Sequence, residues 1–306
     1  MQKADTIAKL NDTEIKTKGP SKMAELIALQ RFVESALPER ERICYDPYAI
    51  HFVDMEMLEF ARKNPEKAKA MRENYERLFP GIGNSIRARV RYFDDFVRTS
   101  IDEGIKQMVI LGAGYDTRAY RIEGLKCKVR TFEVDHPSTQ DVKIRIINKI
   151  FGALPNHVVY VPLDFESEDL GQKLLEYGYD KSQKTLFVME GLVMYISPDA
   201  MDETLSFIVR NSGKESSIIF DYYPKSLVDG TSELEAAKNI YNFLVQQGEP
   251  LKFGIEEEML ETFLTQRGFS RVQSITSEDY KRAYFHGINE NRAVSSLLFL
   301  AHAVVG

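Results

Sequence analysis

The sequence is poor in cysteine, carries no surplus of positive charge and contains no long apolar run. Cys44 and Cys127 are too few for a disulfide framework and lack the spacing and histidine neighbours of a zinc site, so no bound metal is expected. A formal net charge of -6 argues against the basic field that proteins use to bind nucleic acid. No stretch approaches the roughly 18 consecutive apolar residues of a membrane span, and the polar residues 1–20 lack the apolar segment of a signal peptide. These absences predict a cytoplasmic protein without a membrane or nucleic-acid partner.

The domain organisation follows from the absence of a linker. No segment rich in proline, glycine or serine divides the 306 residues, and a hydrophobic content of 43% is enough for a sizeable core. Helical periodicity in residues 21–37 and 86–105, without a strand run, predicts an N-terminal helical cap over residues 1–100. Residues 101–306 are expected to form the core.

Seven short apolar segments predict the strands of a sheet: 107–111, 129–134, 157–162, 185–190, 216–222, 271–276 and 295–304. The first five are apolar nearly throughout and lie far enough apart for crossover helices, which indicates a doubly wound, mostly parallel α/β sheet. Residues 277–294 show no convincing helix, so we expect the last two strands to be antiparallel. An insertion at about 224–256, with a helical pattern ended by Gly248, is expected to form a lid.

A glycine-rich turn follows the first predicted strand. Gly112 and Gly114 allow the backbone to approach a ligand closely, and Asp135 ends the next strand about twenty residues later, where it can accept hydrogen bonds from both ribose hydroxyls. The structural alternative for Asp135 is a cap on the following helix. Nicotinamide dinucleotide sites share both features, but Thr117 stands where their third glycine would be, which favours a nucleoside cofactor without phosphates. An NAD(P)-dependent oxidoreductase and a non-catalytic adenosine-ligand sensor stay open as alternatives.

The motifs LGAGYDTRAYR, FEVDHP, VPLDF and EGLVMYI occur in an order that resembles the leucine carboxyl methyltransferase family. IRARVRYFDDF and the early CYDPYA resemble the small-molecule O-methyltransferase branch of that family, and the likeness is weakest over residues 224–270. The resemblance implies a class I, Rossmann-like methyltransferase that uses S-adenosylmethionine.

The resemblance also implies a set of cofactor-binding residues: Arg89, Gly112, Ala113, Gly114, Asp135, Asp164, Phe165 and Glu190. Arg89 would pair with the methionyl carboxylate of the cofactor. Asp135 would hold the ribose, and Asp164 with Phe165 would flank the adenine. Glu190 would face the cofactor's amino group, and the glycine turn would line its methionine portion.

Two of these residues have structural alternatives. Arg89 could instead pair with Asp94 or Asp95 on the same predicted helix, and Asp164 could be a helix N-cap. A purely structural role is harder to argue for Glu190, because an acid that ends an apolar strand is costly unless it is paired or faces a cleft.

The methyl acceptor is the least determined part of the function. A carboxylate is ionised at neutral pH, whereas a hydroxyl needs a base, and the five histidines show no recognised pairing from which a catalytic residue could be named. We therefore expect a small-molecule carboxylate as acceptor, with a hydroxyl as the alternative. The candidate substrate contacts are Tyr195, Tyr222, Tyr223 and His286. The identity of the acceptor and the oligomeric state stay open.

Overall fold

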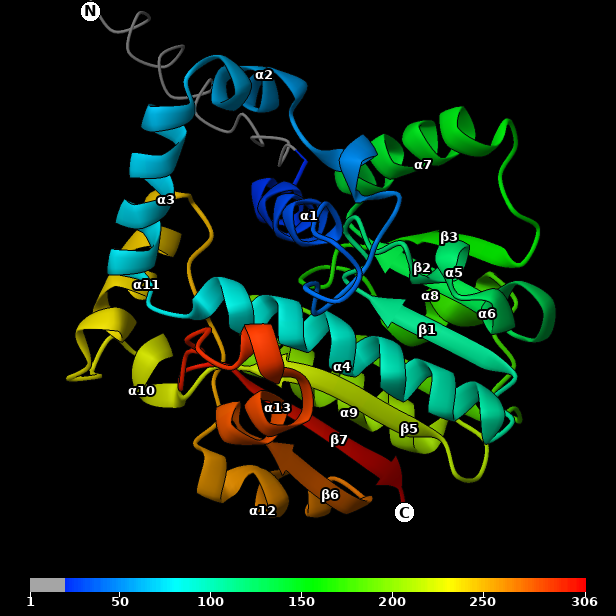
Figure 1. The fold of residues 1–306 in the computed structure, drawn as a ribbon. Coiled ribbons are helices and arrows are strands. Elements are labelled where there is room, and N and C mark those ends of the chain that lie inside the picture. Colours follow the sequence, from blue (N-terminus) through cyan, green and yellow to red (C-terminus); the bar gives the residue numbers. More distant parts are fainter. Residues whose placement is uncertain (1–19) are drawn as a thin grey trace, which may run out of the picture.

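The computed structural model describes residues 20–306, which contain a seven-stranded sheet with helices on both faces (Figure 1). The strand order is β3-β2-β1-β4-β5-β7-β6. The strands are β1 (Gln107–Leu111), β2 (Arg130–Asp135), β3 (Val158–Pro162), β4 (Thr185–Met189), β5 (Ser217–Tyr222), β6 (Phe269–Ile275) and β7 (Phe299–Val305). The first five are parallel, and β7 is antiparallel to both β5 and β6. The predicted mostly parallel α/β sheet is therefore confirmed.

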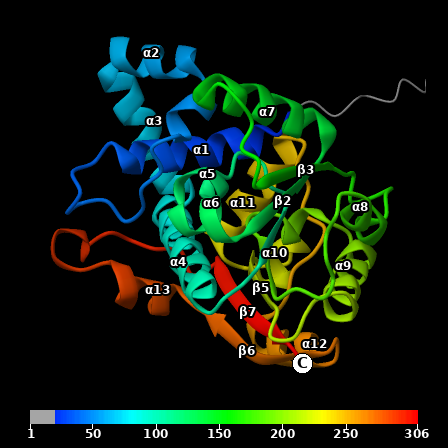
Figure 2. The ribbon, with the colours of Figure 1, turned by 90° about the vertical axis from the view of Figure 1, so that its right-hand side faces the viewer.

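The helices that follow the first strands cover both faces of the sheet. These are α5 (Arg118–Arg121), α6 (Glu123–Lys128), α7 (Pro137–Phe151), α8 (Leu170–Glu176), α9 (Pro198–Arg210) and α12 (Leu260–Thr265). Figure 2 shows α6 on one face of the sheet and α8 and α9 on the other. Every residue of β1, β4 and β5 is buried as a consequence, which explains why these strands are apolar nearly throughout.

Helix α13 (Ser277–Tyr284) corrects the expectation that residues 277–294 contain no helix. Thr276 and Asp279 form a reciprocal capping box at its start, and Tyr280 is its one buried residue. The Tyr280 hydroxyl donates to Ser85 Oγ at 2.9 Å. The helix spans only eight, mostly polar residues, which are too few for its apolar face to stand out in the sequence. A local cap and the hydrogen bonds from Tyr280 to Ser85 and from Tyr284 to Asp95 define it.

Residues 20–102 contain four α-helices: α1 (Lys22–Ser35), α2 (Met55–Lys63), α3 (Pro65–Leu78) and α4 (Ile82–Asp102). The helical patterns expected near α1 and α4 are confirmed. Helix α4 runs through the boundary expected at residue 100, and its Val97 and Ile101 pack in one apolar cluster with Met108 and Ile110 of β1. Helix α1 lies beside α7 (Figure 2), where the Ser21 amide donates to Thr139 Oγ1 at 3.1 Å.

The insertion after β5 holds α10 (Lys225–Val228) and α11 (Glu235–Gln246). Helix α11 lies against α3 (Figure 1), since Asn239 donates to the Leu78 carbonyl at 3.1 Å and the rings of Phe79 and Phe243 meet edge to face at 5.3 Å. Short 3-10 turns complete the described chain at Ala49–Phe52, Val193–Tyr195, Glu257–Met259 and Gly287–Asn289.

The sequence predicted neither a membrane span nor a signal peptide, and the described residues bear on only part of that prediction. None of the helices in residues 20–306 combines the length and the apolar character that a bilayer crossing requires. The polar first residues, on which the expectation about a signal peptide depends, lie outside the described part apart from Pro20.

Candidate active site

A cavity of about 680 Å³ lies beyond the carboxyl ends of the parallel strands. Its floor consists of residues that directly follow β1, β2, β3 and β4. Ligands in open α/β sheets bind at this edge, where the strand order reverses, and the volume falls within the roughly 300–1,000 Å³ of small-molecule sites. All eight residues expected at a cofactor site line this cavity.

The glycine turn shapes one wall. Gly112 and Gly114 have positive φ angles of 65° and 43°, which favour glycine, and a Cβ on Gly112 would lie 2.9 Å from Leu192 Cδ1. The Gly114 amide donates to Asp135 Oδ2, and the His136 amide donates to Asp135 Oδ1 at 2.6 Å. Burial raises the pKa of Asp135, and these two backbone donors offset part of that rise. The carboxylate is thus held in one orientation at the cavity wall.

The helix-cap alternative for Asp135 does not hold. The N-cap of α7 is His136, whose ring nitrogen Nδ1 accepts from the Ser138 amide at 3.3 Å. Asp164 is not a helix N-cap either, because α8 begins after Asp169. Asp164 instead accepts from the Glu166 amide at 3.0 Å and lines the cavity beside Phe165.

Arg89 reaches the cavity from α4 and is only 4% exposed. Its Nε donates to Glu190 Oε1 at 3.0 Å and its Nη1 donates to Asp221 Oδ2 at 2.6 Å. No residue within 20–306 forms a hydrogen bond with its Nη2 atom. The alternative partners Asp94 and Asp95 form ion pairs with other arginines. Arg89 therefore holds two acidic side chains at the site and has one donor group that no described residue engages.

Arg118 does not line the cavity, but it holds Asp116 and Glu190, which do, and it was not predicted from the sequence. Its side chain, 2% exposed, pairs with Asp94 at 2.8 Å, with Glu190 at 2.6 Å and with Asp116. Burial alone would raise the pKa of Asp116, but the charges of Arg118, Lys143 and Arg121 and the Arg118 amide together lower that pKa to about 2. Burial likewise opposes ionisation of Glu190, whose pKa is nevertheless lowered by Arg118 and Arg89. Glu190 is therefore a fixed anion at the cavity.

The buried ionic cluster around Glu190 carries a net charge. Its cations are Arg89, Arg118 and Arg121, and its anions are Asp94, Asp116, Glu190 and Asp221. Three cations against four anions leave one negative charge. Arg89, Asp116 and Glu190 of this cluster line the cavity, so the cluster favours a cationic group in the ligand.

Tyr195 and Tyr223 also line the cavity. No residue of the described chain donates to or accepts from either hydroxyl, and burial raises the pKa of both phenols further above the physiological range. Both hydroxyls stay protonated and can donate to a ligand.

Tyr222 and His286 lie elsewhere, which corrects their assignment as substrate contacts. Tyr222 is fully buried, stacks on Phe299 at 5.4 Å and lies 3.3 Å from Ser274 Oγ. Side chains alternate along a strand, so only Tyr223 of the tyrosine pair faces the cavity. His286 is exposed at the start of a 3-10 turn. His136 is the one histidine of the described residues that lines the cavity, and its Nδ1 is engaged at the start of α7.

Metal binding has no support in residues 20–306, where no three histidine, cysteine or acidic side chains are placed to hold an ion together. The polar groups at the cavity include carboxylates, guanidinium groups and phenols, together with Lys22, Lys252, His136 and the amides of Gln30 and Gln247.

Comparison with known proteins agrees with this geometry. A family model for leucine carboxyl methyltransferase matches residues 24–209. A Bacillus subtilis (strain 168) protein named "Putative S-adenosyl-L-methionine-dependent methyltransferase YktD" is 27% identical over 255 residues, which cover 83% of this chain and 82% of the relative. A Mycobacterium marinum protein with the same name, without the suffix, is 30% identical over 272 residues, or 85% of this chain and 87% of the relative.

The fold has a counterpart among solved structures. A crystal structure of a Thermobifida fusca protein, described as a "putative methyltransferase", superposes with a TM-score of 0.57 at 15% identity, covering 78% of this chain and 87% of that one. The architecture is therefore the class I methyltransferase fold. The family match spans α4, the glycine turn, Asp135, Asp164 and Glu190. This chain belongs to the leucine carboxyl methyltransferase family.

Proposed function

We propose that this protein is an S-adenosylmethionine-dependent O-methyltransferase that methylates a carboxylate of a small molecule. The observation that carries the proposal is a cavity in which the eight expected cofactor residues lie beside two tyrosine hydroxyls that form no hydrogen bond within residues 20–306. The names of the relatives point to the same cofactor.

The adenosine end of the cofactor fits the strand ends. Asp135 and Asp164 offer carboxylate oxygens at the ends of neighbouring strands, and Phe165 offers an aromatic face. A dinucleotide fits poorly, because α5 spans only four residues, Arg118–Arg121, and provides little of the helix dipole that binds a pyrophosphate. The negative net charge of the ionic cluster further disfavours phosphates.

The methionine end of the cofactor fits the ionic cluster. Glu190 is placed to accept from the amino group, and the free Nη2 of Arg89 is placed to donate to the methionyl carboxylate. The single negative charge that the cluster retains complements a sulfonium.

The mechanism requires little beyond positioning. Bound here, S-adenosylmethionine supplies a methyl group activated by a sulfonium for in-line displacement. Tyr195 and Tyr223 donate to the acceptor's carboxylate and orient its reacting oxygen, while α1 and α11 cover the cavity and exclude water. Such orientation lowers the barrier by up to about 7–11 kcal/mol. No proton is removed from an ionised carboxylate, so no base is needed.

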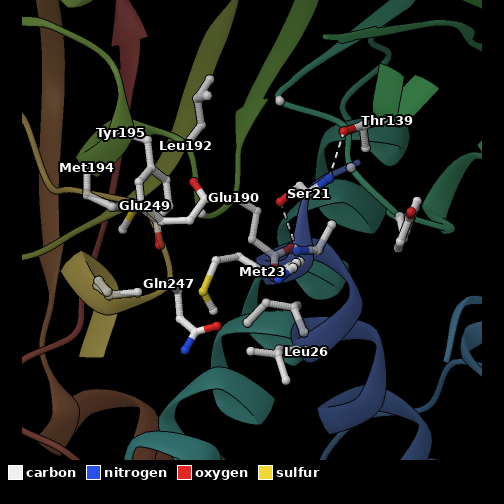
Figure 3. A pocket seen from close by; sticks show the side chains of 18 of the residues that line it. Ser21, Met23, Leu26, Thr139, Glu190, Leu192, Met194, Tyr195, Gln247 and Glu249 are labelled. Carbon is white, nitrogen blue, oxygen red and sulfur yellow. Dashed lines mark hydrogen bonds between the residues drawn. The ribbon is translucent and has the colours of Figure 1, made fainter. Parts of the chain in front are cut away.

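A hydroxyl acceptor is the second candidate, because the acid Glu249 lies at the same end of the cavity as Tyr195. Glu249 follows α11 and lies near Tyr195 (Figure 3), whose pKa its charge helps to raise. A hydroxyl acceptor would use Glu249 as its base.

Thermal unfolding with different ligands tests the cofactor assignment. S-adenosylmethionine and S-adenosylhomocysteine should raise the melting temperature, and NAD and NADP should not, since only a ligand of the native state stabilises it. A rise with NAD alone would refute the proposal. Release of labelled methyl product from labelled S-adenosylmethionine separates an enzyme from a sensor, which would bind without turnover.

A further inference from the structure

The cavity continues past the cofactor residues into an apolar chamber between α1, the start of α4 and α11. We define the chamber by Ile27, Phe79, Ile82, Ile86, Ile240 and Phe243, which line the cavity and belong to one hydrophobic cluster. Figure 3 shows Met23 reaching from α1 across the cavity toward Gln247, beyond the end of α11. None of the six defining side chains carries a charge or a hydrogen-bonding group, and Tyr75, which belongs to the same cluster and lines the cavity, adds one uncharged hydroxyl.

The two unpartnered hydroxyls lie where the chamber meets the cofactor end. The ring of Tyr223 packs against the chamber's hydrophobic cluster, while its hydroxyl group interacts electrostatically with Arg89 and Tyr195. A carboxylate held by both tyrosines therefore has the ionic cluster on one side and hydrocarbon on the other. The rest of the acceptor has to extend into the chamber.

The apolar side chains that line the chamber determine the class of acceptor that can bind there. Among the six apolar side chains, an additional charge would lose its water without gaining a partner of opposite charge, which is costly, whereas each buried methylene is favourable. We infer that the acceptor is a monocarboxylic acid with an uncharged, apolar body, either an alkyl chain or an arylalkyl group. The inference rests on the proposed function, because it takes the tyrosine pair as the site of the reacting group.

A homologous series of acceptors tests the inference in the intact protein. Unbranched alkanoic acids of increasing length, with labelled S-adenosylmethionine, should show kcat/KM rising about fourfold per methylene until the chamber is filled. Dicarboxylic acids of equal length should be at least about 30-fold poorer, because their second carboxylate has no partner in the chamber. Alcohols of equal length are assayed in the same way, to compare a hydroxyl with a carboxylate as the methyl acceptor.

The sequence allows a second, optical readout because it contains no tryptophan. Phe243→Trp places a single indole in the chamber wall, and Val245→Trp places one on the same helix at a position that is 46% exposed. Long-chain acids should change the emission of the Phe243→Trp variant saturably and leave that of the Val245→Trp control unchanged. This binding signal does not depend on turnover.

Four results are informative. Rates that do not depend on chain length, or that favour dicarboxylic acids, would overturn the inference. So would a series in which no acid is methylated and none changes the emission of Phe243→Trp. Methylation of the alcohols in place of the acids would contradict the carboxylate proposal and uphold the apolar body. Absence of S-adenosylmethionine binding would instead refute the proposed function itself.

Discussion

Asp135→Asn is the sharpest perturbation of the cofactor site, because it removes a charge while keeping the shape of the side chain. Each carboxylate oxygen accepts one backbone amide, from Gly114 or His136, and keeps a second lone pair for a ribose hydroxyl. Asparagine retains one accepting oxygen, so one charged hydrogen bond to the ligand is lost. Such a bond contributes about 1.5–3 kcal/mol, which predicts a Kd for S-adenosylhomocysteine about 10- to 150-fold higher.

The assay is calorimetric titration of the wild type and the variant with S-adenosylhomocysteine and with its 2′-deoxy analogue. If Asp135 binds the ribose, loss of the 2′-hydroxyl from the ligand should weaken ligand binding strongly in the wild type and much less in the variant. The difference gives the coupling energy between Asp135 and the hydroxyl. Asp141→Asn is the matched control, because it makes the same change in net charge at an exposed position of α7. Affinity of the Asp135→Asn variant within about twofold of wild type, with no coupling to the hydroxyl, would refute the ribose assignment.

Three further predictions concern the rest of the site. Tyr223→Phe should lower kcat/KM for the acceptor about 10- to 100-fold, by loss of a hydrogen bond to a charged group, whereas Tyr222→Phe should leave it unchanged, and equal effects would contradict the placement of the two rings. The single-turnover rate with a carboxylate acceptor should be flat from about pH 6 to 9, and a rise with pH that Glu249→Gln abolishes would identify a hydroxyl acceptor. Burial raises the pKa of Glu133 to about 7 despite its ion pair with Lys143 at 2.8 Å, so the folded state binds the proton more tightly than the unfolded chain. The free energy of unfolding should therefore decrease as pH rises from about 4.5 to 7, and persistence of that slope in Glu133→Gln would assign it to another group.

Sequence reasoning could predict those parts of the site whose positions follow from a local sequence pattern and from the end of a strand. A buried parallel strand is apolar at every position, and the residue after it lies at the ligand-binding edge of the sheet whatever the rest of the chain does. Gly112, Gly114, Asp135 and Glu190 all follow or end such strands, and all line the cavity. Their placement needed no knowledge of distant contacts.

The features that were missed depend on partners far along the chain. Arg118 was missed because its partners Asp94 and Glu190 lie 24 and 72 residues away, and nothing in the motif around it indicates a triple ion pair. Tyr222 was misassigned because one residue of strand register decides which ring of a tyrosine pair faces the cavity. Both errors arise from tertiary contacts that a periodicity analysis does not contain.

Helix α4 links the two ends of the cavity. One face of this helix carries Ile82, Ile86 and Arg89, which are spaced by four and three residues. That face therefore presents two residues of the chamber wall and the central arginine of the ionic cluster. The ion pairs that fix Arg89 to β4 and β5 therefore also fix the distance from the cofactor end to the chamber. Helix α11 has no share in those ion pairs and is flanked by Gly230 and Gly248, both with positive φ. If the chamber holds the acceptor as proposed, we expect substitutions on α11 to change acceptor selectivity with little effect on cofactor affinity.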